Sequence, residues 1–97
     1  MAKDIDFLEE LEQIIRDRLD DEPRGSYTAR LAAQGDKRMA QKVGEEAIEL
    51  ALAAVAADWE EQLNEAADLL FHVLVLLNAK DLRLADVVKV LRERHRA

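Results

Sequence analysis

Residues 65–77 read EAADLLFHVLVLL, and this stretch decides the fold. After Glu65, every residue in it is apolar except Asp68 and His72. At about 100° per residue, the apolar side chains point in nearly every direction around a helix. A helix that is apolar all round is buried on all sides. In a chain of 97 residues, we therefore expect this helix to pack against its own chain and also against a second copy.

The three polar residues of this helix share one stripe, because Glu65, Asp68 and His72 fall within about 60° of one another on a helical wheel. An isolated buried carboxylate is costly, and such charges persist where they are paired or bind a metal. The two carboxylates are therefore either metal ligands or ion-pair partners of an arginine, with Arg92 and Arg94 as candidates. His72 is either a structural core histidine or a contact of Asp68, which lies one turn earlier.

Apolar periodicity predicts helices over 6–19, 27–33, 36–56, 58–78 and 85–94, and no strand. Ser26, Asp36 and Asp58 are the expected N-caps, and Gly35 is an expected stop. Short connections make neighbouring helices antiparallel. The predicted fold class is all-α: an antiparallel helical bundle of four to five helices, completed by dimerisation, in a single domain spanning 1–97.

Composition excludes several classes of protein. The chain has no Cys, so disulfides and thiolate metal sites are excluded. A net charge of −7 disfavours a nucleic-acid partner. The apolar run 66–77 has about twelve residues, whereas a membrane span needs about twenty, so we expect no membrane partner. The first ten residues have no apolar signal core, which favours a cytoplasmic protein. An acidic chain can still bind a phosphorylated small molecule through a divalent cation.

The preceding long helix carries Glu45, Glu46 and Glu49. Antiparallel packing is expected to place Glu46 and Glu49 opposite the two carboxylates of residues 65–77. Four carboxylates suit Mg²⁺ or Mn²⁺ rather than zinc. The simpler interpretation is a solvated helix face. The predicted core face of this helix, with Glu46 beside it, is Val43, Ala47, Leu50, Ala51 and Ala54.

Several motifs, in a fixed order along the chain, resemble those of a known protein family. EEAIE at 45–49 followed by EAAD at 65–68 resembles the EExxE…ExxD signature of the all-α nucleoside-triphosphate pyrophosphatase superfamily, the MazG-like group. SYTARL at 26–31 with Gly35, KVGEEA at 42–47 and LRER at 91–94 narrow the resemblance to phosphoribosyl-ATP pyrophosphatases. It runs from Phe7 to Arg94. Phe71 departs from the pattern, since Tyr is more usual there.

The resemblance implies hydrolysis of 1-(5-phosphoribosyl)-ATP to 1-(5-phosphoribosyl)-AMP and pyrophosphate, the second step of histidine biosynthesis. It also implies a Mg²⁺ requirement, with Mn²⁺ able to substitute, and a homodimer. Some members are fused to a cyclohydrolase, and the length of this chain predicts the stand-alone form. The number of metal ions, the phosphorus attacked and any sharing of the site between subunits stay open.

The expected site residues fall into three groups. The metal ligands are Glu46, Glu49, Glu65 and Asp68. The general base is either Glu45 or Glu49. Lys42 either contacts phosphate or forms an i, i+4 pair with Glu46, and Ser26 begins a helix whose N–H groups suit an anion. The residues expected to contact phosphate or ribose are Ser26, Tyr27, Thr28, Arg30, Lys37, Arg38 and Lys42.

Two other functions compete with this interpretation. A MazG-like housecleaning pyrophosphatase would use the same carboxylates on other nucleoside triphosphates. A non-catalytic helical dimerisation module would bind no magnesium, but it would not explain why acidic residues line one stripe of an apolar helix.

Overall fold

The computed structural model describes residues 2–56 and 58–96, and its regular secondary structure in these ranges is entirely helical. The all-α class is therefore confirmed, and so are the five expected helices. A short turn at the N-terminus is an addition that periodicity did not predict. The helices are α1 (Ala2–Ile5), α2 (Phe7–Leu19), α3 (Tyr27–Ala33), α4 (Asp36–Val55), α5 (Trp59–Ala79) and α6 (Leu84–Arg94).

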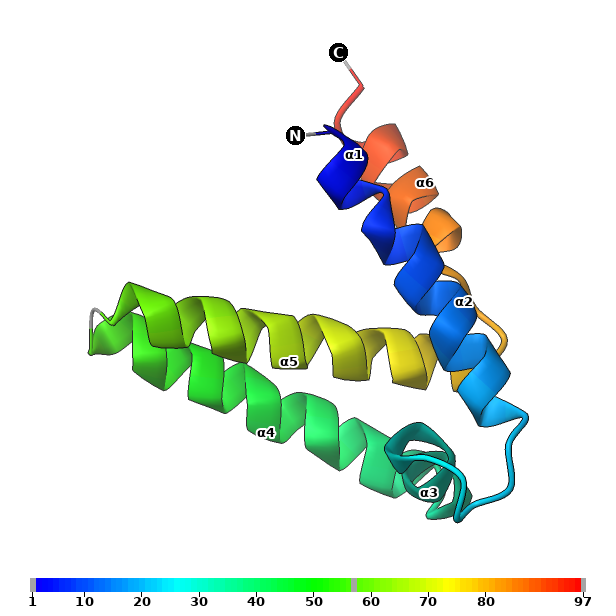
Figure 1. Ribbon diagram of the computed structural model, residues 1–97. Coiled ribbons are helices and arrows are strands. Elements are labelled where there is room, and N and C mark those ends of the chain that lie inside the picture. The colour runs from blue at the N-terminus through cyan, green and yellow to red at the C-terminus, as the bar shows by residue number, and fades with distance from the viewer. Residues whose placement is uncertain (1, 57, 97) are drawn as a thin grey trace.

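A long antiparallel hairpin of α4 and α5 organises the chain (Figure 1). Helix α2 packs against the C-terminal end of α5, and α3 lies at the start of α4. Helix α6 runs beside α2, away from the hairpin, so the chain has the outline of an open V. This arrangement leaves the tip of the hairpin projecting from the rest of the molecule.

The hydrophobic core sits where α2, α3, α4 and α5 meet. Val75 is fully buried and Leu74 is 2% exposed, so α5 supplies the centre of the core. Burying a side chain of this size contributes roughly 1.5–3 kcal/mol. The other members of the core cluster are Ile15, Leu31 and Met39. This packing fixes α5 relative to α4, and therefore fixes the side chains that the two helices present to each other.

The face of α4 that packs on α5 differs from the predicted one. Met39, Glu46 and Ala53 are buried, seven residues apart, whereas the sequence had placed Glu46 beside the core face. Three of the expected core residues are exposed in the chain: Ala47, Ala51 and Ala54. The prediction gave weight to alanines, which bury little apolar surface and so have little influence on the rotation of a helix. Glu46 therefore lies on the face of α4 that packs against α5.

The helix ends agree with the sequence at two of three expected caps. The Ser26 and Asp58 side chains accept hydrogen bonds from the backbone N–H groups of Ala29 and Glu61, at 3.0 and 3.1 Å. Asp36 was predicted as a cap but is the first residue of α4, and Gly35 is the N-cap. Gly35 has φ +97°, a backbone conformation that residues with a side chain rarely adopt. The sharp turn from α3 into α4 therefore depends on glycine.

We expect Asp58→Ala to lower the free energy of unfolding by about 1 kcal/mol, because it removes the N-cap of α5. Asp58→Asn is the matched control, since Asn caps a helix about as well as Asp. Urea unfolding of the three proteins gives the comparison. Equal stability of the Ala and Asn variants would contradict a capping role.

The single chain leaves much of its apolar surface uncovered. Its radius of gyration is 14.6 Å, whereas a compact domain of about 100 residues has roughly 13 Å. Leu70 of α5 is 50% exposed, so one chain does not bury this helix on all sides. Large apolar side chains are also exposed at the end of the hairpin, a surface we call the tip face: Ile48, Leu52, Val55, Trp59 and Leu63. Within the described residues, no helix is both long and apolar enough to cross a membrane.

Candidate functional site

Three carboxylates from the hairpin converge between α4 and α5. One oxygen each from Glu46, Glu49 and Glu65 lies within 4.8 Å of the other two. Glu46 and Glu49 share one side of α4 because residues three apart are neighbours on a helix surface. Glu65 reaches them from α5 because the hairpin is antiparallel. The structure thus brings together three of the four metal ligands expected from the sequence; we call them the carboxylate group.

Two oxygens of the carboxylate group are buried without a hydrogen-bond partner. They are Oε2 of Glu46 and Oε2 of Glu65, and the Glu46 residue is only 7% exposed. A buried polar atom left unpaired costs about 1–3 kcal/mol, and more if it is charged. Neighbouring negative charges add to this cost. A hard divalent cation, which prefers oxygen ligands, would satisfy both oxygens, so the residues fit such an ion.

Asp68 lies apart from the carboxylate group. Its side chain is exposed and is not among the oxygens that converge. Its role as a ligand stays a prediction. The alternative interpretation was an ion pair between an arginine and Glu65 or Asp68. No such ion pair occurs among residues 2–56 and 58–96.

A cavity of about 400 Å³ opens beside the carboxylate group. Glu49 and Glu65 form part of its wall, and Glu61 adds a further carboxylate. The remaining lining is small or apolar: Leu52, Ala53 and Ala56. Ligand pockets have volumes of roughly 300–1,000 Å³. The cavity can therefore admit an anionic group that arrives together with a cation.

Lys42 lies one turn before Glu46 and pairs with it. Its Nζ is 3.2 Å from Oε1 of Glu46 and 3.7 Å from Oε1 of Glu45. The hydrogen bond to Glu46 raises the pKa of Lys42 above its usual value. Lys42 is therefore a fixed cation throughout the neutral range. The predicted i, i+4 pair is confirmed, and the phosphate contact stays a prediction.

Glu45 has both carboxylate oxygens engaged by neighbouring side chains. Oε1 faces Lys42, and Oε2 accepts from Nε2 of Gln41 at 3.1 Å and lies 3.8 Å from Nη1 of Arg38. Glu49, in contrast, is exposed and lines the cavity. Of the two candidate bases, Glu49 is the one that lines the cavity.

The N-terminal end of α3 contributes Tyr27, whose hydroxyl lies 2.7 Å from Nε2 of His72. Ser26 is a helix cap, as predicted. Thr28 is 4% exposed, so its side chain lies in the interior and does not face solvent. Arg30 and Lys37 are exposed and Arg38 is half-buried. Tyr27 lies close enough to Lys42 to contribute to the raised pKa of Lys42, after the larger effect of Glu46. The α3 end therefore adjoins the carboxylate group through Lys42.

The sequence left open whether His72 is a structural core residue or a contact of Asp68. Its Nδ1 lies 2.7 Å from the backbone oxygen of Asp68, so it contacts Asp68 through the main chain. Its second contact, with Tyr27, joins residues 45 positions apart. A polar residue on an otherwise apolar helix marks His72 as unusual, but helical spacing alone cannot identify a partner on another helix.

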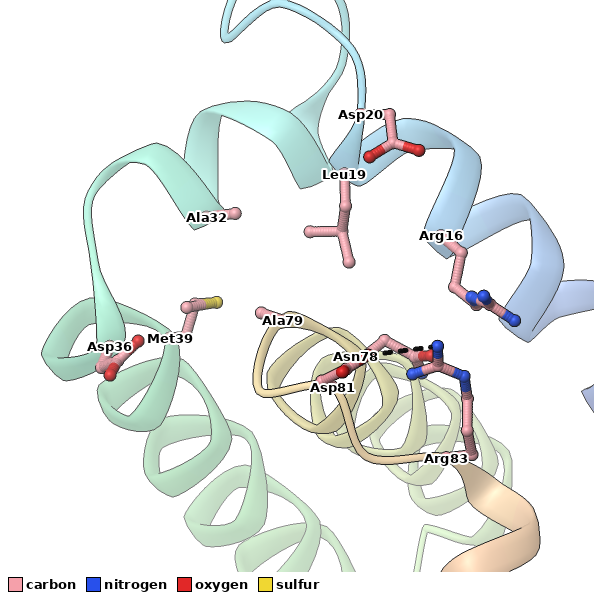
Figure 2. Close-up of a pocket in the computed structure, with 10 residues that line it drawn as sticks. All are labelled: Arg16, Leu19, Asp20, Ala32, Asp36, Met39, Asn78, Ala79, Asp81 and Arg83. Atoms are coloured by element: carbon pink, nitrogen blue, oxygen red, sulfur yellow. Dashed lines mark ion pairs between the residues drawn. The ribbon is translucent and has the colours of Figure 1, made fainter.

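A second cavity, of about 480 Å³, lies at the opposite end of the hairpin, between the end of α2, the start of α4 and the end of α5 (Figure 2). Its charges are mixed, because two arginines and three aspartates line it: Arg16, Arg83, Asp20, Asp36 and Asp81. Arg83 Nη2 and Asp81 Oδ1 form an ion pair at 3.2 Å. Among the described residues, only the carboxylate group gathers three metal-ligating side chains. The candidate site for a cation therefore lies beside the other cavity.

Comparison with known proteins places the chain in a family. Residues 8–95 match the family described as phosphoribosyl-ATP pyrophosphohydrolase. A protein of Yersinia pestis named histidine biosynthesis bifunctional protein HisIE is 54% identical over 94 residues, which are 97% of this chain and 46% of that protein. A protein of the same name from Vibrio cholerae is 52% identical over 90 residues, or 93% of this chain and 43% of that protein.

The chain thus spans less than half the length of these curated relatives. The match covers α2 from its second residue onward and all of α3 to α6, and it includes the whole carboxylate group. On this match, the chain belongs to the phosphoribosyl-ATP pyrophosphohydrolase family.

Proposed function

We propose that the chain hydrolyses 1-(5-phosphoribosyl)-ATP to 1-(5-phosphoribosyl)-AMP and pyrophosphate, the second step of histidine biosynthesis. The observation that carries the proposal is the carboxylate group, with two unpartnered buried oxygens beside a cavity. The family match supports the choice of substrate. The buried acids also argue against a non-catalytic module, which would gain nothing from them. We expect this nucleotide chemistry in the cytoplasm.

Magnesium is the proposed metal, with Mn²⁺ as a substitute, because every oxygen in the carboxylate group comes from a carboxylate. Glu46, Glu49 and Glu65 would hold it, with Asp68 as a further ligand. When bound, the ion would polarise the phosphoryl oxygens of the substrate and lower the pKa of water.

The chain's own residues would then bind and orient the nucleotide. Lys42 keeps its positive charge and stands next to Glu46, where it can neutralise a phosphate oxygen. We propose that Glu49, rather than Glu45, accepts the proton of the attacking water, because Glu49 lines the cavity while both oxygens of Glu45 are engaged. Arg30, Lys37 and Arg38 remain candidates for further phosphate contacts.

Incubation with phosphoribosyl-ATP and Mg²⁺, followed by identification of both products, tests the proposed reaction. We expect phosphoribosyl-AMP and pyrophosphate in equal amounts, and no turnover with EDTA. A parallel panel of ordinary and modified nucleoside triphosphates tests the housecleaning alternative. Faster turnover of a member of that panel than of phosphoribosyl-ATP would overturn our choice of substrate.

We also propose that the chain works as a homodimer in which the tip face is covered by a second copy. The tip face exposes five large apolar side chains, of which Trp59 is 71% and Val55 is 86% exposed. Exposed large apolar side chains gathered at one end of a molecule are typical of an interaction site. Leu52 belongs both to the tip face and to the cavity wall. A partner seated there would therefore close the cavity beside the carboxylate group.

We expect light scattering after size exclusion to give the mass of two chains for the wild type. Leu52→Asp should shift the population toward the single chain, because it places a charge in the apolar contact. Glu10→Lys, a charge change on an exposed position of α2, is the control and should leave the mass unchanged. A monomeric wild type at micromolar concentration would contradict the proposal.

A further inference from the structure

A chain of hydrogen bonds links two helices, α5 and α3, beside the proposed site. The backbone oxygen of Asp68 lies 2.7 Å from Nδ1 of His72, and Nε2 of His72 lies 2.7 Å from the hydroxyl of Tyr27. His72 is 7% exposed, whereas Tyr27 is 42% exposed. The inner end of the chain is therefore buried in α5, and its outer end, on α3, faces solvent.

The direction of both hydrogen bonds follows from the chemistry of the groups. A backbone carbonyl only accepts, so Nδ1 of His72 must carry the hydrogen. In a neutral imidazole the other nitrogen is then an acceptor. Nε2 therefore accepts from the Tyr27 hydroxyl, whose single hydrogen points toward the interior. The solvent-facing side of the Tyr27 oxygen carries only lone pairs, so it can accept a hydrogen bond but cannot donate one.

Aromatic packing holds this arrangement in place. The Tyr27 and His72 rings meet edge to face, with centroids 5.7 Å apart and an interplanar angle of 87°. Phe71 contacts both rings, at 5.2 Å from His72 and 6.3 Å from Tyr27. Rotation of either ring would break these contacts, so the Tyr27 oxygen is fixed in direction as well as in polarity. The hydrogen-bonded chain also ends on the backbone of Asp68, one turn of α5 from Glu65, which places it next to the carboxylate group.

A phosphate oxygen is an acceptor, and an oxygen that has given up its only hydrogen cannot donate to it. A sugar hydroxyl can donate. We propose that His72 is a positioning residue that takes the hydroxyl hydrogen of Tyr27, so that Tyr27 accepts a hydrogen bond from a sugar hydroxyl of the nucleotide and does not contact its phosphates. This inference rests on the proposed function, and it decides between the phosphate and ribose roles that the sequence left open for Tyr27.

Steady-state kinetics with phosphoribosyl-ATP and Mg²⁺ test the role of the pair. Tyr27→Phe and His72→Asn should each raise KM about tenfold and change kcat less than about twofold, because they remove binding shared by the ground and transition states. His72→Gln, unlike His72→Asn, should keep KM within about threefold of the wild-type value, because the longer Gln side chain can place its amide oxygen where it accepts a hydrogen bond from Tyr27. His95→Gln, on the exposed C-terminal segment, is the control. An unchanged KM in Tyr27→Phe would overturn the proposal.

Inhibition by the two products separates sugar from phosphate recognition. Tyr27→Phe should raise the inhibition constant of phosphoribosyl-AMP about tenfold and that of pyrophosphate less than twofold, since pyrophosphate has no sugar hydroxyl. An equal loss for both products, or a larger loss for pyrophosphate, would show a phosphate contact and overturn the proposal.

The tautomer of His72 can be determined by NMR spectroscopy, without measuring enzyme activity. The chain has two histidines, so ¹⁵N-labelled imidazole signals are assigned by comparison with His95→Gln. We expect hydrogen on Nδ1 and none on Nε2 of His72 in the ligand-free protein at pH 8. Hydrogen on Nε2 would overturn the inference even in an active enzyme. A wild type inactive on phosphoribosyl-ATP would instead overturn the proposed function, while the tautomer would still be measured.

Discussion

Replacing Glu65 with Gln is expected to reduce kcat/KM at least about 100-fold while leaving the metal-free protein as stable as the wild type, or more stable. Metal affinity depends strongly on the ligands and the residues that support them, and losses of about 10–100-fold follow even from outer contacts. Glu65 has a buried oxygen without a hydrogen-bond partner. Its negative charge lies close to those of Glu46 and Glu49. Without a metal, removing that charge relieves repulsion.

The opposite signs of the two effects make this prediction specific. A residue needed only for folding would lose activity and stability together. Glu60→Gln is the matched control, because Glu60 lies on the same helix in an exposed position. Thermal unfolding with and without Mg²⁺ accompanies the kinetics, and the Mg²⁺-induced rise in Tm should be smaller for Glu65→Gln than for the control. Equal activity of the two variants would remove Glu65 from the site.

Leu74→Ala is expected to lower the free energy of unfolding by about 2–5 kcal/mol, the usual cost of emptying a buried leucine position. Leu74 is 2% exposed and belongs to the cluster that joins α5 to α2, α3 and α4. Stabilities of small domains are about 5–15 kcal/mol in total. This one substitution therefore removes a large share of the stability.

Urea unfolding at one fixed protein concentration measures this loss, since association with a second copy would also stabilise the fold. In a domain of this size, each kcal/mol corresponds to about 4–8 °C in Tm. Leu82→Ala is the control, because Leu82 is 47% exposed in the connection between α5 and α6. If the two variants lose the same stability, the core does not lie where the structure places it.

Local rules were enough to predict the hairpin and the convergence of three of the expected carboxylates. Caps and apolar periodicity depend on residues within one or two turns, so the bounds of α4 and α5 could be predicted closely. The spacing of Glu46 and Glu49 on α4 needs only the helical repeat. The pairing of these two with Glu65 needs only a short antiparallel connection.

The rotation of α4 could not be predicted in the same way. Ala47 and Ala51 looked like core residues, but α4 instead turns Glu46 toward α5. This orientation follows from how the larger side chains of two helices interlock, which no single helix specifies. The contact between Tyr27 and His72 is also beyond local rules, because it depends on where α3 meets α5.

Anomalous diffraction from crystals grown with Mn²⁺ and a non-hydrolysable analogue of phosphoribosyl-ATP tests the central claim most directly. We predict a metal peak within about 2.0–2.6 Å of oxygens from Glu46, Glu49 and Glu65 and of the polyphosphate, the range for hard cations with oxygen ligands. Density for the nucleotide with no metal at these three residues, or with the metal in the cavity lined by Asp20, Asp36 and Asp81, would contradict the account.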